Sequence, residues 1–447
     1  MFNFWVQHSP IFYLIQSIWR DEAFSILLSE RSPLWFVSKN FDPPLYYILL
    51  HFWMKLFGES ELATRSLSIV GFSLATIVVI YWAEKLFKKH WLSWYLPIFF
   101  FFNPMLLYYA FEIRAYAWYV LFTVLSFMTY LEEKWILNAV FIVLGLYTHS
   151  YMIIVPVTET VHYILTHWKQ FNIRKPATIL NNLFLRSMAV SLLLFSPWLY
   201  HFVMSSNQLK NAWYFPVDFH LIRSVLGNLF LGYEGTPGFI WDYSTVLSLI
   251  LLIAFAFALK DKRDRTVKSF FCLMVFFPLI VVIGISFWKP LFVNRYVIPV
   301  SIAEVLLLAL ALRDIKNPIL QKGLAVIALL FVVGFNMWYP TKHAKVNIRS
   351  TVLQVNALMT KQDVILVDSP LVLFETIYYS SDRSRVFLYN PERYPFPWYV
   401  GGIIVKPNQI VYDYPPYPMR AFIIKSDGSY DMRYSTDALA QPKPAKK

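Results

Sequence analysis

The chain is built mainly of long apolar runs joined by short, basic links. Ten runs are recognisable, and most have the roughly 20 residues needed to cross a hydrocarbon core about 30 Å thick. They cover 66–83, 91–111, 115–131, 135–148, 150–168, 187–206, 241–259, 269–288, 291–312 and 322–340. Only 15% of the residues are charged, against about 25% in a soluble domain. We therefore expect a multi-pass α-helical membrane protein with about 10–11 transmembrane helices.

The links between the runs differ in charge. Lysine and arginine gather in five of them, at 84–90, 132–134, 167–186, 260–268 and 313–322. The positive-inside rule places these links in the cytoplasm. The opposite face then carries a first outer loop at 20–65, a large outer loop at 207–240 and everything after 341. The net charge of +13 follows from this plasma-membrane topology, and no nucleic-acid partner is expected.

The sequence changes in character after residue 341. A helix is indicated over 348–359, and "DVILVDS" and "RVFLYN" are typical of strands that flank a helix in "LVLFETIYYSS". This order predicts a βαβ unit with parallel strands. We expect a membrane domain over 1–340, a small extracytoplasmic α/β domain over 341–437, and a disordered tail over 438–447, where "ALAQPKPAKK" shows no apolar pattern.

Two neighbouring carboxylates, Asp21 and Glu22 of "SIWRDEAFS", stand next to an apolar run. A charge at membrane depth costs about 3 kcal/mol on insertion scales, so it requires a reason. In a helix, adjacent side chains point about 100° apart, and only one of the two would face a given cavity. Such a carboxylate suits a general base that removes a proton from an acceptor hydroxyl. A helix cap explains the pair equally well.

Further polar residues interrupt "YYAFEIRAY", "YTHSY" and "NRYVIP". Glu112 and Tyr116 are spaced to share a helix face. Arg114 and Arg295 each offer a planar fork of donors suited to phosphate. The simpler interpretations are an ion pair between Glu112 and Arg114, an Arg295 side chain that snorkels to the headgroups, and a structural role for His149.

Several common site motifs do not occur in the sequence. It has no H-E-x-x-H or C-x-x-C spacing, no G-x-G-x-x-G, and only 13 glycines, so neither a metal-ligand motif nor a nucleotide-cradling loop is indicated. A donor would have to be held without such a loop, for instance by a membrane anchor. No metal ligand is assigned and no cofactor is indicated, although two neighbouring carboxylates could hold a divalent metal ion.

Taken in order, the motifs resemble those of the GT-C glycosyltransferases, in particular the dolichyl-phosphate-mannose-protein mannosyltransferase and RgtA/B/C/D-like branch. The resemblance spans most of residues 12–340 and rests on "WRDEAFS", "DPPLYYILLHFWMKLFGESELATRSLSIVGF", "YYAFEIRAYA", "GLYTHSY", "SPWLY" and "NRYVIP". It implies the GT-C fold. It also implies an inverting transferase that moves a sugar from a polyprenyl-phosphate donor to a lipid, glycan or protein acceptor.

The resemblance also implies roles for individual residues. Asp21 matches the catalytic base, Glu22 completes the acidic pair, and Glu112 lies beside the active site. Arg114 and Arg295 match residues near the donor phosphate. The remaining polar residues of these motifs are candidate substrate contacts: Asp42, Tyr116, His149 and Tyr296. Asp42 departs from the pattern, because many relatives have histidine before the "PP" pair, and it adds a third outer carboxylate that could act as the base.

Three other functions remain open on the sequence. A transporter or flippase of lipid-linked sugars would use similar basic residues in the membrane, although no internal repeat of the kind common in transporters is recognisable. An oligosaccharyltransferase or O-antigen-ligase-like enzyme would use the same chemistry with a larger donor. A structural or interaction protein would use only the outer domain.

Overall fold

The computed structural model describes residues 2–170, 181–205, 216–232 and 238–436. The chain forms two compact units. The helical unit contains the described residues of 1–14, 41–49 and 62–343, and the sheet unit those of 15–40, 50–61 and 344–447. The first outer loop is thus divided between the two units, which the predicted boundary at 340 does not anticipate.

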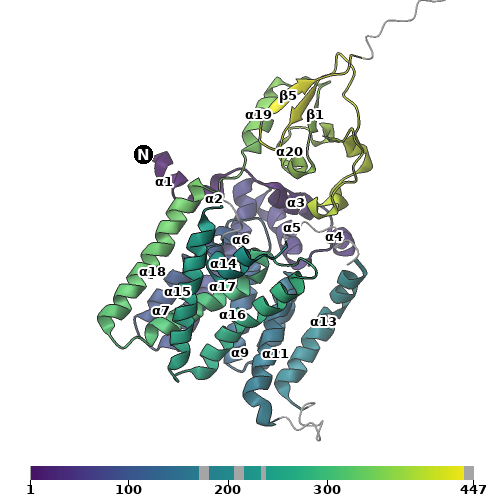
Figure 1. Cartoon of the computed structure of the whole chain (residues 1–447). Coiled ribbons are helices and arrows are strands. Elements are labelled where there is room, and N and C mark those ends of the chain that lie inside the picture. Colours follow the sequence, from purple (N-terminus) through teal and green to yellow (C-terminus); the bar gives the residue numbers. More distant parts are fainter. Residues whose placement is uncertain (1, 171–180, 206–215, 233–237, 437–447) are drawn as a thin grey trace, which may run out of the picture. The chain divides into compact units, whose positions relative to one another are not determined.

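In the helical unit the long helices run alongside one another as a bundle (Figure 1). Every predicted run is mainly helical: α6 (Glu61–Phe87), α7 (Leu92–Phe101) with α8 (Pro104–Ala110), α9 (Tyr116–Leu131), α10 (Trp135–Leu146), α11 (Ile154–His167), α13 (Leu183–Ser205), α15 (Ile240–Lys260), α16 (Arg265–Ser286), α17 (Ile298–Arg313) and α18 (Pro318–Trp338). Short 3-10 turns precede α11 (η1, Ser150–Ile153) and α17 (η4, Asn294–Val297). The predicted multi-pass helical fold is confirmed.

Length separates these helices into two groups. Within the described residues, six segments are long and apolar enough to cross a membrane, namely α6, α13, α15, α16, η4 with α17, and α18. Shorter apolar helices include α7, α9, α10 and also α5 (Leu45–Phe57). The described part of the predicted outer loop 207–240 contains a helix that the sequence analysis missed, α14 (Phe219–Leu231). The predicted tail at 438–447 lies outside the described residues.

Helix α17 is the core of the helical unit. It packs against α7, α9, α14, α15 and α16, and nearly all of its residues are buried. A helix that is apolar on every side is covered either by lipid or by other helices, and here neighbouring helices cover it. Its first turn follows η4, so the chain that enters this buried helix carries Arg295 and Tyr296.

The sheet unit contains a five-stranded sheet in the order β3-β2-β1-β4-β5. The strands are β1 (Val364–Val367), β2 (Val386–Tyr389), β3 (Ile410–Val411), β4 (Ala421–Ile424) and β5 (Tyr430–Arg433). Strand β1 pairs in parallel with β2 and β4, and β5 is antiparallel to β4. Helix α20 (Leu373–Tyr379) lies between β1 and β2 in the chain, which confirms the predicted βαβ unit.

Three more helices belong to the sheet unit, and two short helices precede them in the chain. Helix α19 (Ile348–Leu358) packs against α20 and β4, and α20 packs against α3 (Arg20–Ser29). Helix α4 (Pro33–Lys39) follows α3, and α2 (Ile11–Ile15) precedes it, after α1 (Phe2–Gln7). The segment with the Asp21–Glu22 pair is therefore packed on residues that lie more than 300 positions later in the chain.

Helices α14 and α15 approach closely at Gly227. A Cβ atom on Gly227 would lie 2.2 Å from the carbonyl oxygen of Ser244, while the Gly227 amide donates to Ser248 Oγ at 2.8 Å. We predict that Gly227→Ala destabilises the protein by about 1–3 kcal/mol, because a backbone atom blocks the added methyl group. Gly323 of α18 has open space around it, so Gly323→Ala should raise stability by up to about 1 kcal/mol. Thermal melting of the purified variants checks both, and equal effects would contradict the prediction.

Candidate functional site

A small cavity of about 100 Å³ lies within the helical unit. Its walls come from the segment before α5, the turn before α9, the α10–η1 turn and η4, with one residue from α13. Its lining comprises Phe41, Asp42, Pro43, Tyr47, Arg114, Ala115, Tyr116, Thr148, His149, Ser150, Tyr151, Phe202, Leu291 and Tyr296. Pockets for drug-sized ligands usually measure roughly 300–1,000 Å³. This cavity therefore fits a group the size of a phosphate rather than a whole sugar.

A short chain of polar contacts lines one side of the cavity. Tyr47 donates its hydroxyl hydrogen bond to Asp42 Oδ2 at 2.9 Å. The Arg114 guanidinium lies 3.5 Å from the Tyr47 oxygen, at the long limit of a hydrogen bond. The two prolines after Asp42 place Leu45 at the start of α5, and the Leu45 amide donates to the carbonyl of Tyr147 at 2.9 Å. This last bond joins the "DPP" segment to the "YTHSY" turn.

His149 is enclosed by aromatic rings. It stacks on Tyr119 with ring centroids 4.7 Å apart, and the rings of Tyr116 and Tyr296 lie within 5.6 Å and 5.3 Å of it. Burial, and then the positive charges of Arg114 and Arg295, lower the pKa of His149 from 6.5 to about 3. The ring retains some accessible area, but that area faces a small cavity rather than bulk solvent. The imidazole is therefore neutral at physiological pH.

The tautomer of His149 follows from its backbone contact. The Tyr151 amide donates to Nδ1 at 3.2 Å, so the neutral ring carries its proton on Nε2 and can donate there. Arg295 is almost fully buried, and its guanidinium lies 5.6 Å from the centre of the Tyr296 ring. Two guanidiniums beside a neutral imidazole donor make an arrangement suited to an anion, and a planar fork suits phosphate oxygens in particular.

The structure places Glu112 outside the helix in which the sequence analysis expected it. It lies at a bend between α8 and α9, not within a helix, so the expected helical spacing from Glu112 to Tyr116 does not exist. Its side chain is almost fully buried and is not among the residues that line the cavity. Its carbonyl oxygen accepts hydrogen bonds from the Arg114 amide at 2.8 Å and from Ser68 Oγ at 2.6 Å. These bonds hold the turn that carries Arg114.

In the sheet unit, Asp21 and Glu22 occupy the first turn of α3. Glu22 is fully buried, and its carboxylate accepts from the Trp19 amide at 3.3 Å and from Lys345 Nζ at 3.2 Å. Asp21 keeps about 16% of its side chain accessible and forms an ion pair with Arg20 at 2.9 Å. The expected divergence of the two carboxylates is thus present. The cap interpretation describes Glu22 well, whereas Asp21 stays near the surface of its unit.

Residues after 344 hold the Asp21 segment in place within the sheet unit. Tyr379 accepts from the Ile18 amide at 2.7 Å and donates to Glu61 at 2.6 Å. Arg349 binds Glu61 through both carboxylate oxygens. The ring of Phe24, on α3, lies 5.9 Å from that of Phe374, on α20. The position of α3 therefore depends on the C-terminal region.

Glu375 adds a buried carboxyl group at the start of α3. It receives a backbone hydrogen bond from Arg20, yet burial raises the pKa of Glu375 from 4.5 to about 8. The positive charges of Arg20 and Lys345 oppose this rise, and the negative charge of Glu22 reinforces it. Among the described residues, none donates a hydrogen bond to its Oε2 atom. Glu375 is thus a protonated carboxyl at neutral pH, on the helix α20 that packs against the helix carrying Asp21.

The structure brings five of the nine sequence-predicted residues into one cavity: Asp42, Arg114, Tyr116, His149 and Tyr296. Arg295 acts on His149 through its charge. Sequence reasoning missed Tyr47 and Tyr151, although both stand in motifs quoted for the resemblance. Nothing in the sequence indicates Phe202 or Leu291, which come from distant segments. Within the described ranges, no group of three or more His, Cys, Asp or Glu side chains is arranged to hold a metal ion.

Comparison with solved structures identifies the fold. The chain is similar to ArnT from Cupriavidus metallidurans in the apo state, with 12% identity, a TM-score of 0.61, and coverage of 94% of this chain and 90% of ArnT. ArnT bound to undecaprenyl phosphate gives 13% identity, a TM-score of 0.60 and the same coverage. The Archaeoglobus fulgidus oligosaccharyltransferase, in complex with zinc and sulfate, gives 10% identity and a TM-score of 0.52, over 91% of this chain and 64% of its own.

These likenesses define an integral membrane protein with the GT-C fold, as the sequence motifs predict. At such low identity they show the fold alone. No protein-family model and no curated protein matches the sequence.

The raised pKa of Glu375 predicts a pH-dependent stability. Between pH 4.5 and about 8 the folded protein retains a proton that the unfolded chain loses, so this contribution is complete below pH 4.5 and is lost as the pH rises through about 8. Glu375→Gln imitates the protonated carboxyl. The melting temperature of the variant relative to wild type should therefore rise between pH 5 and pH 9. Glu392→Gln, at an exposed carboxylate of the same unit, is the control. A difference that stays constant over this range would refute the assignment.

Proposed function

We propose that the protein transfers a sugar from a polyprenyl-phosphate donor to a lipid, glycan or protein acceptor on the extracytoplasmic face of the membrane. The observation that carries this proposal is the cavity that gathers Arg114, Tyr116, His149 and Tyr296 beside Arg295 in a GT-C fold. ArnT, which shares the fold, has been crystallised with undecaprenyl phosphate. A donor of this class presents a phosphate, and the Arg114 guanidinium and the His149 Nε2 donor at this small cavity suit such a group.

In the proposed reaction Asp21 is the general base. The acceptor hydroxyl gives its proton to the Asp21 carboxylate while its oxygen attacks the anomeric carbon of the donor sugar. The bond from that carbon to the phosphate oxygen breaks, and the phosphate leaves with its lipid. A single displacement inverts the configuration at the anomeric carbon. The sugar–phosphate bond supplies the driving force, so no separate nucleotide is needed.

The other polar residues take supporting roles in this proposal. Arg114 and Arg295 stabilise the charge that develops on the leaving phosphate, and His149 donates a hydrogen bond from Nε2. Glu22 and Glu112 position other residues: Glu22 caps α3, which carries Asp21, and the Glu112 carbonyl holds the turn with Arg114. Asp42 is the competing candidate for the base, but its carboxylate already accepts the hydrogen bond from Tyr47.

The first test replaces the proposed base. Asp21→Asn keeps the size of the side chain and removes its negative charge. We predict that release of polyprenyl phosphate by the purified protein in nanodiscs falls at least about 100-fold, the scale of general-base catalysis. The assay offers polyprenyl-phosphate hexoses and pentoses together with acceptors from membrane extracts.

Two further variants make this test specific. Asp413→Asn, at an exposed carboxylate of the same unit, should keep full activity. If Asp42→Asn abolishes turnover and Asp21→Asn does not, Asp42 is the base. If wild type and both variants bind donor and none consumes it, the enzyme proposal is wrong and transport of lipid-linked sugars takes its place.

The second test addresses the phosphate. Arg114→Lys keeps the charge and loses the planar fork of donors. Hydrogen bonds to charged groups contribute about 1.5–3 kcal/mol, so the KM for the donor should rise about ten- to a hundredfold. Arg223→Lys is the control, because Arg223 pairs with the exposed Asp242 and not with the cavity. An unchanged KM for Arg114→Lys, in a folded protein, would exclude Arg114 from donor binding.

A further inference from the structure

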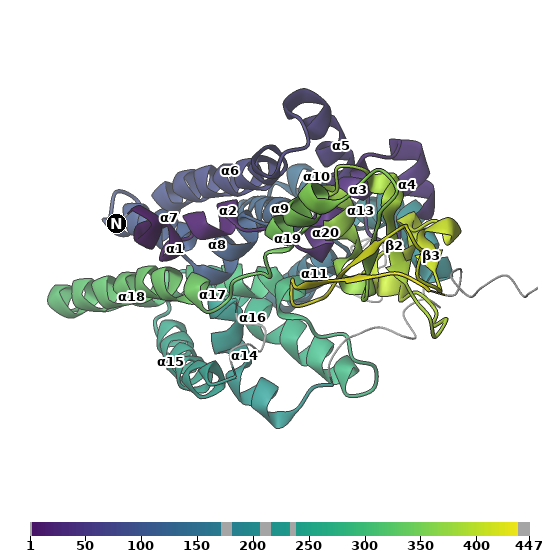
Figure 2. The same ribbon diagram turned by 90° about the horizontal axis from the view of Figure 1, so that it is seen from above.

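A second and larger cavity, of about 990 Å³, forms a groove along the helical unit. Helices α15 and α18 form its walls, α17 contributes to its floor, and α7 and α14 each add a phenylalanine. Both views place α15 and α18 at one side of the bundle (Figures 1 and 2). The groove shares no lining residue with the cavity around His149.

The groove matches one membrane leaflet in length. Its lining runs from Leu247 to Asp261 along α15 and from Asn317 to Phe331 along α18. Each stretch rises by 14 residues, or about 21 Å at 1.5 Å per residue. Half of a bilayer, with its headgroup region included, measures about 20–22 Å. A single lipid chain can therefore lie in the groove along its whole length, with its headgroup at the end formed by the turns after α15 and α17.

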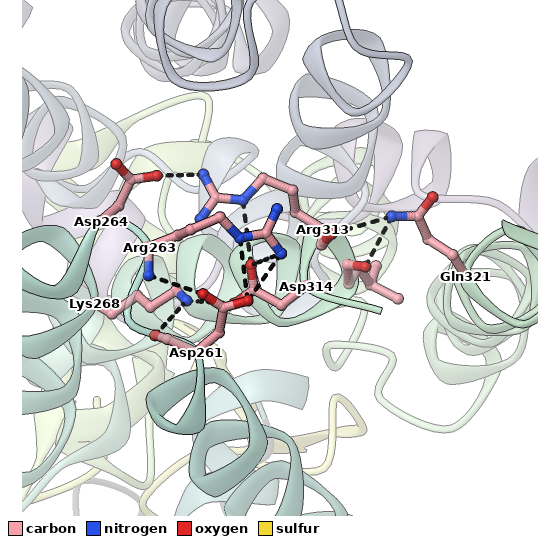
Figure 3. A network of polar contacts seen from close by, with 8 residues as sticks. Asp261, Arg263, Asp264, Lys268, Arg313, Asp314 and Gln321 are labelled. Carbon is pink, nitrogen blue, oxygen red and sulfur yellow. Dashed lines mark hydrogen bonds and ion pairs between the residues drawn. The ribbon is translucent and has the colours of Figure 1, made fainter. Parts of the chain in front are cut away.

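The polar end of the groove adjoins a charge network (Figure 3). Arg263 binds Asp261 at 2.9 Å, Arg313 binds Asp264 at 2.6 Å, and the buried Lys268 pairs with Asp314. Arg263 and Arg313 also approach Asp314, at 3.3 Å and 3.4 Å. Three cations and three carboxylates thus neutralise one another. The carboxylates that line the groove, Asp261 and Asp314, are therefore neutralised by the cations of the network.

Two lysines at the same end of the groove do not belong to this charge network. Lys260 and Lys316 both line the groove and are exposed. Within the ranges that the structure describes, neither lysine side chain forms a hydrogen bond or an ion pair. The groove therefore combines a leaflet-long apolar surface with two cations that no carboxylate of the network neutralises. This combination complements an amphiphile with an anionic headgroup.

We propose that this groove binds one anionic glycerophospholipid, with an acyl chain between α15 and α18 and its phosphate beside Lys260 and Lys316. Bulk lipid would cover the apolar surface without selecting a headgroup. A transmembrane helix of a second copy would fill the groove without requiring the lysines. The two lysines thus favour the anionic lipid over either occupant. The proposal is independent of glycosyl transfer, because it involves none of the residues assigned to that reaction.

Native mass spectrometry of the full-length protein tests the headgroup. The delipidated protein is offered phosphatidylglycerol, phosphatidylcholine or polyprenyl phosphate. Wild type should retain phosphatidylglycerol in preference to phosphatidylcholine. One lysine near a membrane surface contributes about fivefold in affinity, equivalent to about 1 kcal/mol. Lys260→Ala/Lys316→Ala should therefore lose about thirtyfold of this preference. Lys262→Ala/Lys322→Ala removes the same charge from nearby positions that do not line the groove, and should change nothing.

Groove-filling variants test the acyl chain. Ala254→Trp and Ala328→Trp place a large side chain inside the groove, whereas Ala256→Trp places it on the exposed side of α15. The first two should lose bound phosphatidylglycerol, and the third should keep it, with unfolding temperatures measured for all three. Equal retention of both phospholipids by wild type, or an unaltered lysine variant, would overturn the proposal. So would displacement of phosphatidylglycerol by polyprenyl phosphate, or groove filling that changes the oligomeric state and leaves lipid retention intact.

Discussion

The structure depends on one constraint: a bilayer offers no water to a polar group, so every polar group in the bundle needs a partner or a cavity. Most helices of the helical unit meet this constraint with apolar side chains. Some exceptions lie within helices, such as Glu159, which accepts hydrogen bonds from Ser126 and Asn138. Others stand where helices begin and end. The turn at Arg114, the turn at His149 and η4 with Arg295 all interrupt helices, and the first two, with Tyr296 of η4, border the same small cavity. Irregular backbone at such points is tolerated where it lines a cavity, and here it carries the cationic side chains.

The neutral state of His149 is a consequence of this arrangement. A protonated imidazole beside Arg114 and Arg295 would add a third positive charge in a buried space, and both burial and those charges keep its pKa low. The aromatic rings around it provide apolar surroundings, in which electrostatic interactions are stronger than in water. The Arg114 guanidinium then lines the cavity, with the carboxylate of Asp42 as the nearby counter-charge, linked through Tyr47. An anion that enters this space would meet donors that are already oriented.

The sequence predicts those features that depend on local pattern. Hydrophobic runs of about 20 residues located the helices, because length and apolarity are local properties, and "DVILVDS" and "RVFLYN" located β1 and β2 for the same reason. The motif residues Arg114, His149 and Tyr296 could be selected because polar residues are conspicuous in apolar runs. Glu112 was misjudged, since the chain bends just where helical spacing was assumed. Helix α14 was missed inside a presumed loop. The pairing of Glu22 with Lys345, and the packing of α3 on α20, join positions more than 300 residues apart, and no local pattern indicates such a contact.

The division of the chain bears on how the proposed chemistry would be assembled. Asp21 belongs to the sheet unit, whereas the cavity with Arg114 and His149 belongs to the helical unit. A base and a leaving-group site must hold their reactants within about 3–3.5 Å of reacting geometry. Here the chain passes between the units after residues 14, 40, 49, 61 and 343. Within the sheet unit, Lys345, Glu375 and Tyr379 of the C-terminal region fix the position of α3. In the proposed reaction, these contacts therefore orient Asp21, the general base.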